Sequence, residues 1–322
     1  MEGGVSATGW SNRAWPLAIL AAVGLVLGIV FANADMTPPD TGIYYAASNF
    51  EHLYGRVWLA DGDYVYSPAF AMALEPLRAL GPGPFIVLWT GLMFVSFAIA
   101  GRWLAVAFVI GGLLLLPIVG GSTPATLPLQ YLLVGNMHVV IPAVIVLGFR
   151  WPALWSIVLL TKILPGIGLI WFAVRREWRH LGWAIGATAV AVVVSATVAP
   201  SSWADYVGFL WENRATPSTH ELAPLPLWVC LPVAAAVIIW GARTDRAWAV
   251  PIACGIASLA LYQWSYVIVW IGAATLIAPL DVRGQLARLG ALGTRLDGSR
   301  PRALRLAAVR VSGGSLILRL LH

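Results

Sequence analysis

The run WPLAILAAVGLVLGIVFA at residues 15–32 sets the class of fold for this chain. It contains no charged residue, and its length approaches the about 20 residues that an α-helix needs to cross the hydrocarbon core of a bilayer. It is also too long and too uniformly apolar for the central region of a signal peptide. We therefore expect a membrane-spanning first helix that is retained in the protein.

The composition of the whole chain also indicates a membrane protein. Of its 322 residues, 60% are hydrophobic and 11% are charged, whereas soluble proteins average about a quarter charged residues. We predict an all-α, polytopic membrane protein in which residues 1–282 form one multi-span domain. The two cysteines, Cys230 and Cys254, fall inside apolar runs, which argues against a disulfide framework. No cofactor is expected.

The basic residues lie between the apolar runs. A net charge of +6 is compatible with nucleic-acid binding, but short cytoplasmic loops of membrane proteins also collect arginine and lysine. We therefore expect a lipid bilayer, and not nucleic acid, as the partner. The N-terminus and a basic tail at residues 283–322 are then cytoplasmic. The other residues assigned to that side are Arg13, Arg102, Arg150, Arg175, Arg176, Arg179, Arg243 and Arg246.

This assignment predicts about ten membrane segments. Arg150 and Arg175 are both placed on the cytoplasmic side, yet the chain between them is long enough for one full crossing only. We therefore expect two half-length helices that meet at a break at Lys162–Pro165. The pattern leaves the number of crossings between Pro68 and Arg102 open. The remaining crossings are expected near residues 103–119, 135–149, 181–199, 225–241, 247–262 and 264–280.

A polar segment at residues 34–67 separates the first two apolar regions. Successive membrane segments cross the bilayer in opposite directions, so this segment becomes a large first extracytoplasmic loop. The same reasoning places residues 120–134 and 200–224 on the extracytoplasmic side. Asp61 and Asp63 in this loop offer hard oxygen ligands for a divalent ion. A single D-x-D pair without further ligands is a weak signal, so no metal site is predicted.

Lys162 is the single lysine of the chain and lies within the apolar run 157–172. A charge at bilayer depth costs about 2.5–3.5 kcal/mol on insertion scales, so such a residue usually faces a cavity, a carboxylate or an anionic ligand such as phosphate. The alternative is a side chain that reaches the membrane interface or pairs with a loop carboxylate. Either arrangement directs Lys162 toward the extracytoplasmic loops.

Several short motifs occur in an order that is typical of one family of membrane enzymes. They are Asp40-Thr41-Gly42-Ile43-Tyr44-Tyr45-Ala46-Ala47, Tyr66-Ser67-Pro68, Gly135-Asn136-Met137-His138, Lys162-Ile163-Leu164-Pro165 and the basic loop Arg175–Arg179. Over residues 15–180 the chain resembles the bacterial polyprenyl-phosphate-mannose-dependent mannosyltransferases of the GT-C superfamily. The resemblance implies a GT-C-like bundle of membrane helices.

The chain departs from that family at three places. Asn136 stands where glutamine is usual, and Ser67 stands where a second proline is usual. Near the last helices the chain reads Trp264-Ser265-Tyr266, where a histidine motif is common. These departures fall inside the motifs, so they bear on the identity of the substrate. The C-terminal half of the chain matches the family by hydropathy alone.

The resemblance implies a glycosyltransferase of the cell membrane with an extracytoplasmic active site. Such an enzyme moves a sugar, here mannose, from a polyprenyl-phosphate donor to a hydroxyl of a glycolipid or cell-envelope glycan, with inversion. By its place in the motif Asp40 is the expected general base, because the attacking hydroxyl must lose its proton. The leaving phosphate needs positive charge nearby. Lys162 is the first candidate for this role, supported by Arg214 and His220.

Five further residues are candidates for binding the substrates: Tyr44, Tyr45, Tyr66, Asn136 and His138. Tyrosines can stack on a sugar or hydrogen-bond to its hydroxyls. Aromatic residues are also enriched at both membrane interfaces, and this chain has 17 tryptophans, so an interfacial role is the alternative for them. His138 begins an apolar run, where a packing role is the alternative.

Two other classes of function stay open from the sequence. A secondary transporter or lipid flippase also uses broken helices and a buried lysine such as Lys162. The sequence shows no internal repeat and concentrates its carboxylates in the loop after the first helix, which favours the enzyme. A degenerate, non-catalytic membrane protein is the third hypothesis, and it predicts that Asp40→Asn is tolerated.

Overall fold

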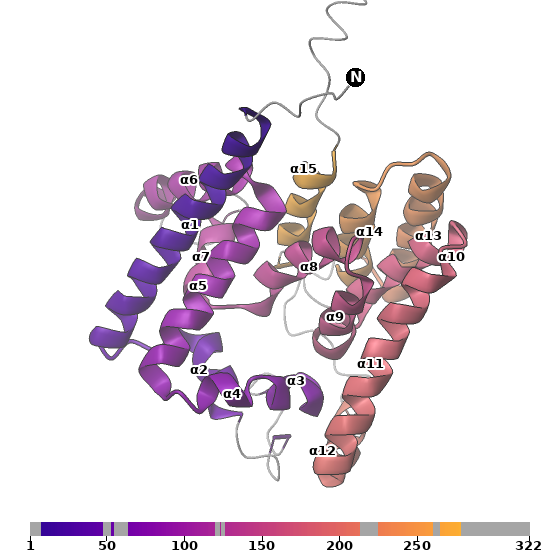
Figure 1. Cartoon of the computed structure of the whole chain (residues 1–322), viewed down its shortest axis with the longest axis horizontal. Coiled ribbons are helices and arrows are strands. Elements are labelled where there is room, and N and C mark those ends of the chain that lie inside the picture. The colour runs from indigo at the N-terminus through magenta and orange to yellow at the C-terminus, as the bar shows by residue number, and fades with distance from the viewer. Residues whose placement is uncertain are drawn as a thin grey trace, which may run out of the picture. The chain divides into compact units, whose positions relative to one another are not determined.

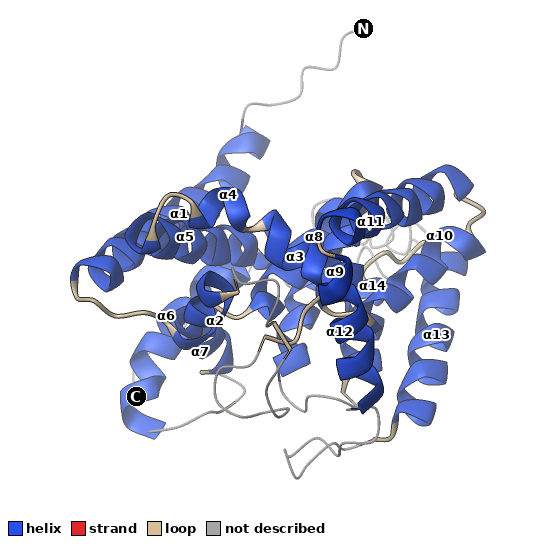
Figure 2. Ribbon diagram, turned by 90° about the horizontal axis from the view of Figure 1, so that it is seen from below, coloured by secondary structure: helices blue, strands red, loops and turns tan. Residues whose placement is uncertain are grey.

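The computed structural model of this protein describes residues 8–47, 53–54, 64–119, 123, 126–212, 225–259 and 265–277. All regular elements in these ranges are helices, and none is a strand (Figure 2). The predicted all-α class is therefore confirmed for the part that the structure describes. The chain divides into two compact units, Met1–Ile277 and Ala278–His322. The predicted basic tail lies in the second unit, outside the described residues.

The first half of the chain contains the helices that surround the polar loop. They are α1 (Thr8–Asn33), α2 (Pro39–Ala46), α3 (Pro68–Ala73), α4 (Glu75–Arg78), α5 (Pro82–Gly101), α6 (Trp103–Val119), α7 (Leu127–Val134), the 3-10 turn η1 (Met137–Val139) and α8 (Val140–Gly148). In Figure 1, α1, α5, α6 and α7 form one group, and α8 lies between them and the later helices.

The second half alternates short and long helices. They are η2 (Pro152–Leu154), α9 (Trp155–Thr161), η3 (Leu164–Leu169), α10 (Ile170–Val174), α11 (Trp178–Val198), α12 (Pro200–Glu212), α13 (Leu227–Arg243), α14 (Ala249–Ser258), η5 (Ser265–Gly272) and α15 (Ala273–Leu276). Helix α14 packs against α13 and η3, and α11 packs against α9 (Figure 1).

Among the described residues, three helices are long and apolar enough to cross a membrane: Ala14–Asn33, Pro82–Gly101 and Trp178–Val198. Leu127–Val134 and Met137–Gly148 pass the same test as a pair bent by 119°, which makes a fourth crossing if the pair is one span. Further apolar helices of 10–17 residues include α6, α13 and α14. The helical membrane character is confirmed, and the number of about ten segments stays a prediction.

Helices α1 and α5 pack side by side through glycines (Figure 1). A Cβ atom on Gly28 would lie 2.8 Å from the Cα of Val87, and one on Gly24 would lie 2.7 Å from the Cβ of Phe94. Small residues at this spacing let two membrane helices approach until their backbones touch. The predicted first helix is therefore present and firmly seated on α5.

The region between Pro68 and Arg102, whose crossing number the sequence left open, contains one long helix. Two short helices, α3 and α4, precede it and are separated from it by Gly81. Gly81 has a φ of 93°, which favours glycine, and Pro82 occupies the start of α5, where a missing N–H costs nothing. The glycines and prolines of this region begin α5, and they do not interrupt it.

The predicted break at Lys162–Pro165 is confirmed. Helix α9 ends at Thr161, Lys162 has an extended backbone with φ −134° and ψ 93°, and η3 begins at Leu164. Pro165 has no N–H to continue a helical hydrogen-bond series, which accounts for the break at this point. Broken helices in membrane proteins usually line a cavity.

Two segments that the sequence predicts to lie on the extracytoplasmic side contain helices. Residues 200–212 form α12, and residues 127–134 form α7. Pro200 starts α12, and Phe209 is buried with its ring 5.4 Å from that of Tyr54. This contact is tertiary, and tertiary packing supplies most of the stability of short helices.

Candidate active site

Asp40 lies in the first turn of α2, directly after Pro39. A carboxylate at this end of a helix is stabilised by the backbone N–H groups that have no helical partner. Asp40 is half-buried, and Tyr44, one turn later on the same face, is 1% exposed. The sequence of α2 thus presents one acidic and one aromatic side chain to the interior.

The turn before η1 packs directly on α2. Gly135 has a φ of 78°, and a Cβ at this position would lie 2.1 Å from the Thr41 hydroxyl. The indole N–H of Trp89 donates a hydrogen bond of 2.9 Å to the carbonyl of Gly135. Because only glycine accommodates both the backbone conformation and the close contact, Gly135 brings the next residue, Asn136, to Asp40.

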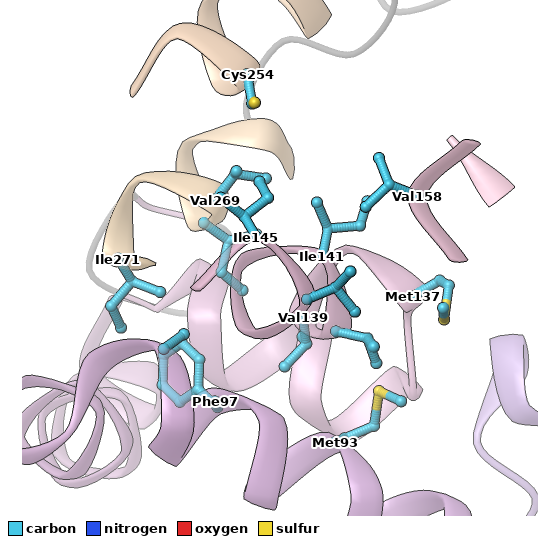
Figure 3. Close-up of a cluster of buried hydrophobic side chains, with 14 of the residues drawn as sticks. Met93, Phe97, Met137, Val139, Ile141, Ile145, Val158, Cys254, Val269 and Ile271 are labelled. Carbon is cyan, nitrogen blue, oxygen red and sulfur yellow. The ribbon is translucent and has the colours of Figure 1, made fainter. Parts of the chain in front are cut away.

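Asn136 joins the turn to the acid. Its side-chain Nδ2 donates a hydrogen bond to Asp40 Oδ2, and its Oδ1 accepts one of 2.9 Å from the backbone N–H of His138 and contacts Nδ1 of the same residue. On either side of His138, Met137 and Val139 insert into a buried apolar cluster that includes Met93 (Figure 3). The apolar neighbours therefore anchor the turn that carries the polar pair.

Tyr44 and Tyr66 form the inner wall of the site. Their hydroxyls are 3.0 Å apart, and the backbone N–H of Met137 donates to the Tyr44 hydroxyl at 3.3 Å. The two rings meet edge to face with centroids 5.4 Å apart, and Tyr66 is 5% exposed. Both rings belong to the protein interior. Tyr45 packs separately, with its ring 5.3 Å from that of Phe85.

Lys162 reaches the same place from the broken helix. Its Nζ lies over the ring of Tyr66, 4.7 Å from the centroid, and the residue is 9% exposed. This distance is within the range of a cation–π interaction. The structure therefore brings the lone lysine to the closing motif of the first loop.

The charges of Asp40 and Lys162 act on one another. Burial raises the pKa of Asp40 above its usual value, while the hydrogen bond from Asn136 and the positive charge of Lys162 oppose this rise. An acid whose pKa is raised by burial, within electrostatic reach of a buried cation, is a pattern found at functional sites. Here the two groups come from distant parts of the sequence.

The comparisons with known proteins show the family of this chain. A family model, glycosyltransferase family 87, matches residues 64–278. The chain belongs to glycosyltransferase family 87. It is therefore a glycosyltransferase enzyme of the membrane. Neither the curated proteins nor the solved structures gave a match. The matched range contains Asn136, His138 and Lys162, and Asp40 precedes it.

In this family 87 enzyme, two residues that support the site were not predicted from the sequence. The guanidinium of Arg78 is buried, donates a hydrogen bond of 3.3 Å to the carbonyl of Tyr44, and forms an ion pair with Glu75. Trp89 bonds to Gly135, as described above, and its ring lies 5.0 Å from that of Tyr44. The spacing of Glu75 and Arg78 was a visible signal of an ion pair. Trp89 had no signal that set it apart from the other tryptophans.

Some candidate residues of the family 87 enzyme lie outside the described residues. These are Arg214, His220, Asp61 and Asp63. Among the residues that the structure does describe, no group of three or more His, Cys, Asp or Glu side chains is placed to hold a metal ion. The site described here consequently consists of Asp40, Lys162 and the residues that hold them.

Proposed function

We propose that this glycosyltransferase transfers mannose from a polyprenyl-phosphate donor to a hydroxyl of a glycolipid or cell-envelope glycan, on the extracytoplasmic side of the cell membrane. The observation that carries the proposal is the meeting of Asp40 and Lys162 in one site. They come from the first loop and from a broken helix, 122 positions apart (162 − 40). An acid for proton removal and a cation for a phosphate are the two groups that this reaction requires.

Asp40 is the proposed general base. As the acceptor hydroxyl attacks the anomeric carbon, a new carbon–oxygen bond forms and the hydroxyl proton passes to the carboxylate. The Oδ2 atom of Asp40 is held by Asn136. The raised pKa of Asp40 makes its carboxylate a stronger base than a solvent-exposed aspartate.

Lys162 is the proposed partner of the leaving group. The bond from the anomeric carbon to the phosphate oxygen breaks, and its electron pair stays on the polyprenyl phosphate. A buried ammonium group stabilises this charge more strongly than an exposed one, because water does not screen it. Arg214 and His220 are proposed to assist Lys162.

The roles of the tyrosines follow from their burial. Tyr44 and Tyr66 are too enclosed to form an open platform for a sugar, so we assign them to the support of Asp40 and Lys162. Tyr66 contributes its ring face to Lys162. Tyr45 is half-buried and packs on Phe85, so its proposed contact with substrate uses its exposed edge.

The proposed orientation places both the N-terminus and the tail at residues 283–322 in the cytoplasm. Arg150, Arg175 and Arg243 then face the cytoplasm, as the positive-inside rule requires. Residues 34–67 form the extracytoplasmic loop. In this orientation a lipid-linked donor reaches Asp40 from the outer leaflet, and no nucleotide sugar is needed.

The test measures transfer of radiolabelled mannose from polyprenyl-phosphate-mannose to a lipid extract by the purified protein. We expect transfer by the wild type, loss of about 100-fold or more in Asp40→Asn, and a fall of kcat in Lys162→Met. Asp35→Asn is the matched control, because Asp35 is an exposed acid of the same loop. Full activity of Asp40→Asn would remove Asp40 from the mechanism. Lipid movement without transfer would instead support the flippase hypothesis.

A further inference from the structure

A row of hydrogen bonds connects the protein interior to Asp40. Asn136 donates from Nδ2 to Asp40 Oδ2, and its Oδ1 contacts both the backbone N–H and the ring Nδ1 of His138. His138 is 2% exposed, and Tyr131 packs edge-on against its ring with centroids 5.7 Å apart. The row therefore starts at a histidine that the interior holds in place.

The backbone of His138 fixes the direction of each bond in this row. A backbone N–H group only donates, so the Asn136 atom that it meets at 2.9 Å is the amide oxygen. That oxygen has no proton to give, so Nδ1 of His138 must carry the proton between them. The NH2 group of Asn136 then necessarily faces Asp40, whose carboxylate accepts.

The opposite orientation of the Asn136 amide is unfavourable. A rotated amide would bring its oxygen against the Asp40 carboxylate and its NH2 group against the two N–H donors of His138. Each of these contacts would leave a buried polar group without a hydrogen bond, at a cost of about 1–3 kcal/mol. His138 thus acts on Asp40 through the orientation of Asn136: its backbone N–H and its ring Nδ1 both contact the Asn136 oxygen, and the side chain supplies the second of these contacts.

We propose that Asn136 and His138 are positioning residues for Asp40, holding its Oδ2 atom so that Oδ1 takes the proton of the acceptor hydroxyl. The proposal rests on the assignment of Asp40 as general base. Within the described part of the chain, Oδ1 of Asp40 makes no hydrogen bond. The row consequently leaves one carboxylate oxygen for the substrate.

Other titratable groups also face this row. Lys162 and Tyr44 interact electrostatically with Asp40, Lys162 also acts on His138, and Tyr131 contacts the His138 ring. Among the groups around Asp40, the Asn136 hydrogen bond and the charge of Lys162 favour the ionised carboxylate. Loss of the ordered amide should therefore raise the pKa of Asp40, because its carboxylate loses a donor.

The test compares His138→Asn with His138→Leu in the full-length protein. Asparagine places an NH2 group close to the position of Nδ1, whereas leucine has nearly the same shape and no donor. The first readout is labelling of Asp40 by dicyclohexylcarbodiimide, a reagent for protonated carboxyl groups, followed across pH by mass spectrometry. The backbone N–H at position 138 still donates to the Asn136 oxygen in His138→Leu, so this variant removes only the side-chain donor. We expect the labelling midpoint to rise in His138→Leu, by up to about one pH unit, and to stay near the wild-type value in His138→Asn.

The second readout is the kinetics of mannose transfer. We expect kcat to fall about tenfold or more in His138→Leu through misplacement of the base, with little change in KM, and to recover in His138→Asn. An unchanged labelling midpoint in His138→Leu overturns the proposal. If His138→Leu does not fold, Asn136→Leu carries the same expectation for the midpoint.

Asp40→Asn separates this proposal from the proposed function. Loss of transfer in Asp40→Asn together with wild-type behaviour of His138→Leu in both readouts rejects the positioning role and keeps the base. Wild-type transfer by Asp40→Asn rejects the assignment of Asp40 as general base. It then also rejects a catalytic role for the hydrogen bonds from Asn136 and His138. In that case, comparison of the Asp40 labelling midpoints of His138→Leu and the wild type still shows whether the hydrogen-bond row exists.

Discussion

Ser67 donates two hydrogen bonds to a single carbonyl oxygen, that of Leu160: one from its backbone N–H at 3.2 Å and one from its hydroxyl at 2.7 Å. Leu160 lies in the last turn of α9, two residues before Lys162. The closing end of the first loop is therefore tied to the helix that carries the lysine. Loop and lysine are expected to be displaced together by changes at this junction.

Removal of these bonds should loosen the junction in steps. Ser67→Ala removes the hydroxyl bond to Leu160 and also the cap of α3, in which the same hydroxyl accepts from the Phe70 N–H, and should lower the free energy of unfolding by about 1–2 kcal/mol. Ser67→Pro removes the backbone donor as well and should cost about 1 kcal/mol more than Ser67→Ala; the φ of Ser67, −65°, is one that proline adopts. Thermal unfolding in detergent measures both. Ser156→Ala is the control, because the Ser156 hydroxyl is exposed and bonds locally to Ala153; an equal effect there would contradict the prediction.

Gly135→Ala should destabilise the site strongly. The new Cβ would meet the Thr41 hydroxyl at 2.1 Å, in a backbone conformation with positive φ. We expect a loss of about 1–3 kcal/mol or more of stability, together with a loss of transfer as Asn136 moves from Asp40. Gly111→Ala in α6 is the matched control, since a Cβ there meets no atom within 4 Å, and a small gain from helix propensity is expected.

Asp40 should make stability and activity respond oppositely to pH. Burial raises its pKa in the folded protein, so the folded state binds the proton more tightly than the unfolded state does. Stability is then highest below about pH 4, the value of a free aspartate, and falls as pH rises through the raised pKa. With Asp40 as the proposed general base, transfer should follow the opposite trend, because only the carboxylate can accept the proton.

Asp40→Asn should accordingly be more stable than the wild type at pH 7, and the difference should shrink as pH falls toward about 4. Melting temperatures of both proteins across this range measure the effect. Exposed Asp35→Asn should show no such gain. A lower melting temperature for Asp40→Asn at pH 7 would mean that the ionised carboxylate stabilises the fold.

The orientation in the membrane can be measured with engineered cysteines. Asp35→Cys and Asp245→Cys place thiols at exposed positions that the proposed topology puts on opposite sides. A membrane-impermeant maleimide should label Cys at 35 from outside intact cells and Cys at 245 only after permeabilisation. Background labelling should be low, because Cys230 and Cys254 are buried. The reverse pattern would place Asp40 in the cytoplasm and reject the proposed function.

The sequence predicted structure best where the signal lay within one segment of the chain. The spacing of Arg150 and Arg175, together with Pro165, predicted the broken helix, and the apolar run 15–32 predicted α1, because these signals can be read along one continuous stretch of sequence. The sequence predicted an extracytoplasmic segment at residues 200–224 but did not predict the helix α12 within it. The ring of its Phe209 packs against that of Tyr54, and these residues are 155 positions apart (209 − 54). A pattern within one segment cannot show such a contact.

The candidate site could be located from the sequence more readily than its internal arrangement. The motifs predicted that Asp40, Asn136 and Lys162 belong together, and the structure brings them into one place. Asn136 was expected to bind substrate, yet its amide bonds to Asp40 and faces His138. Burial of Tyr44 was equally hidden, since a tyrosine in a polar loop has the composition of an exposed residue.

The contact of α1 with α5 limits the paths by which a lipid can approach. Since the backbones meet at Gly28 and Val87, no acyl or prenyl chain fits between these two helices, and α2, which carries Asp40, follows α1 and packs on α5. The space between α1 and α5 is closed by backbone atoms, and opening it would require the two helices to separate. The proposed lipid-linked donor must therefore reach Asp40 along another side of the protein.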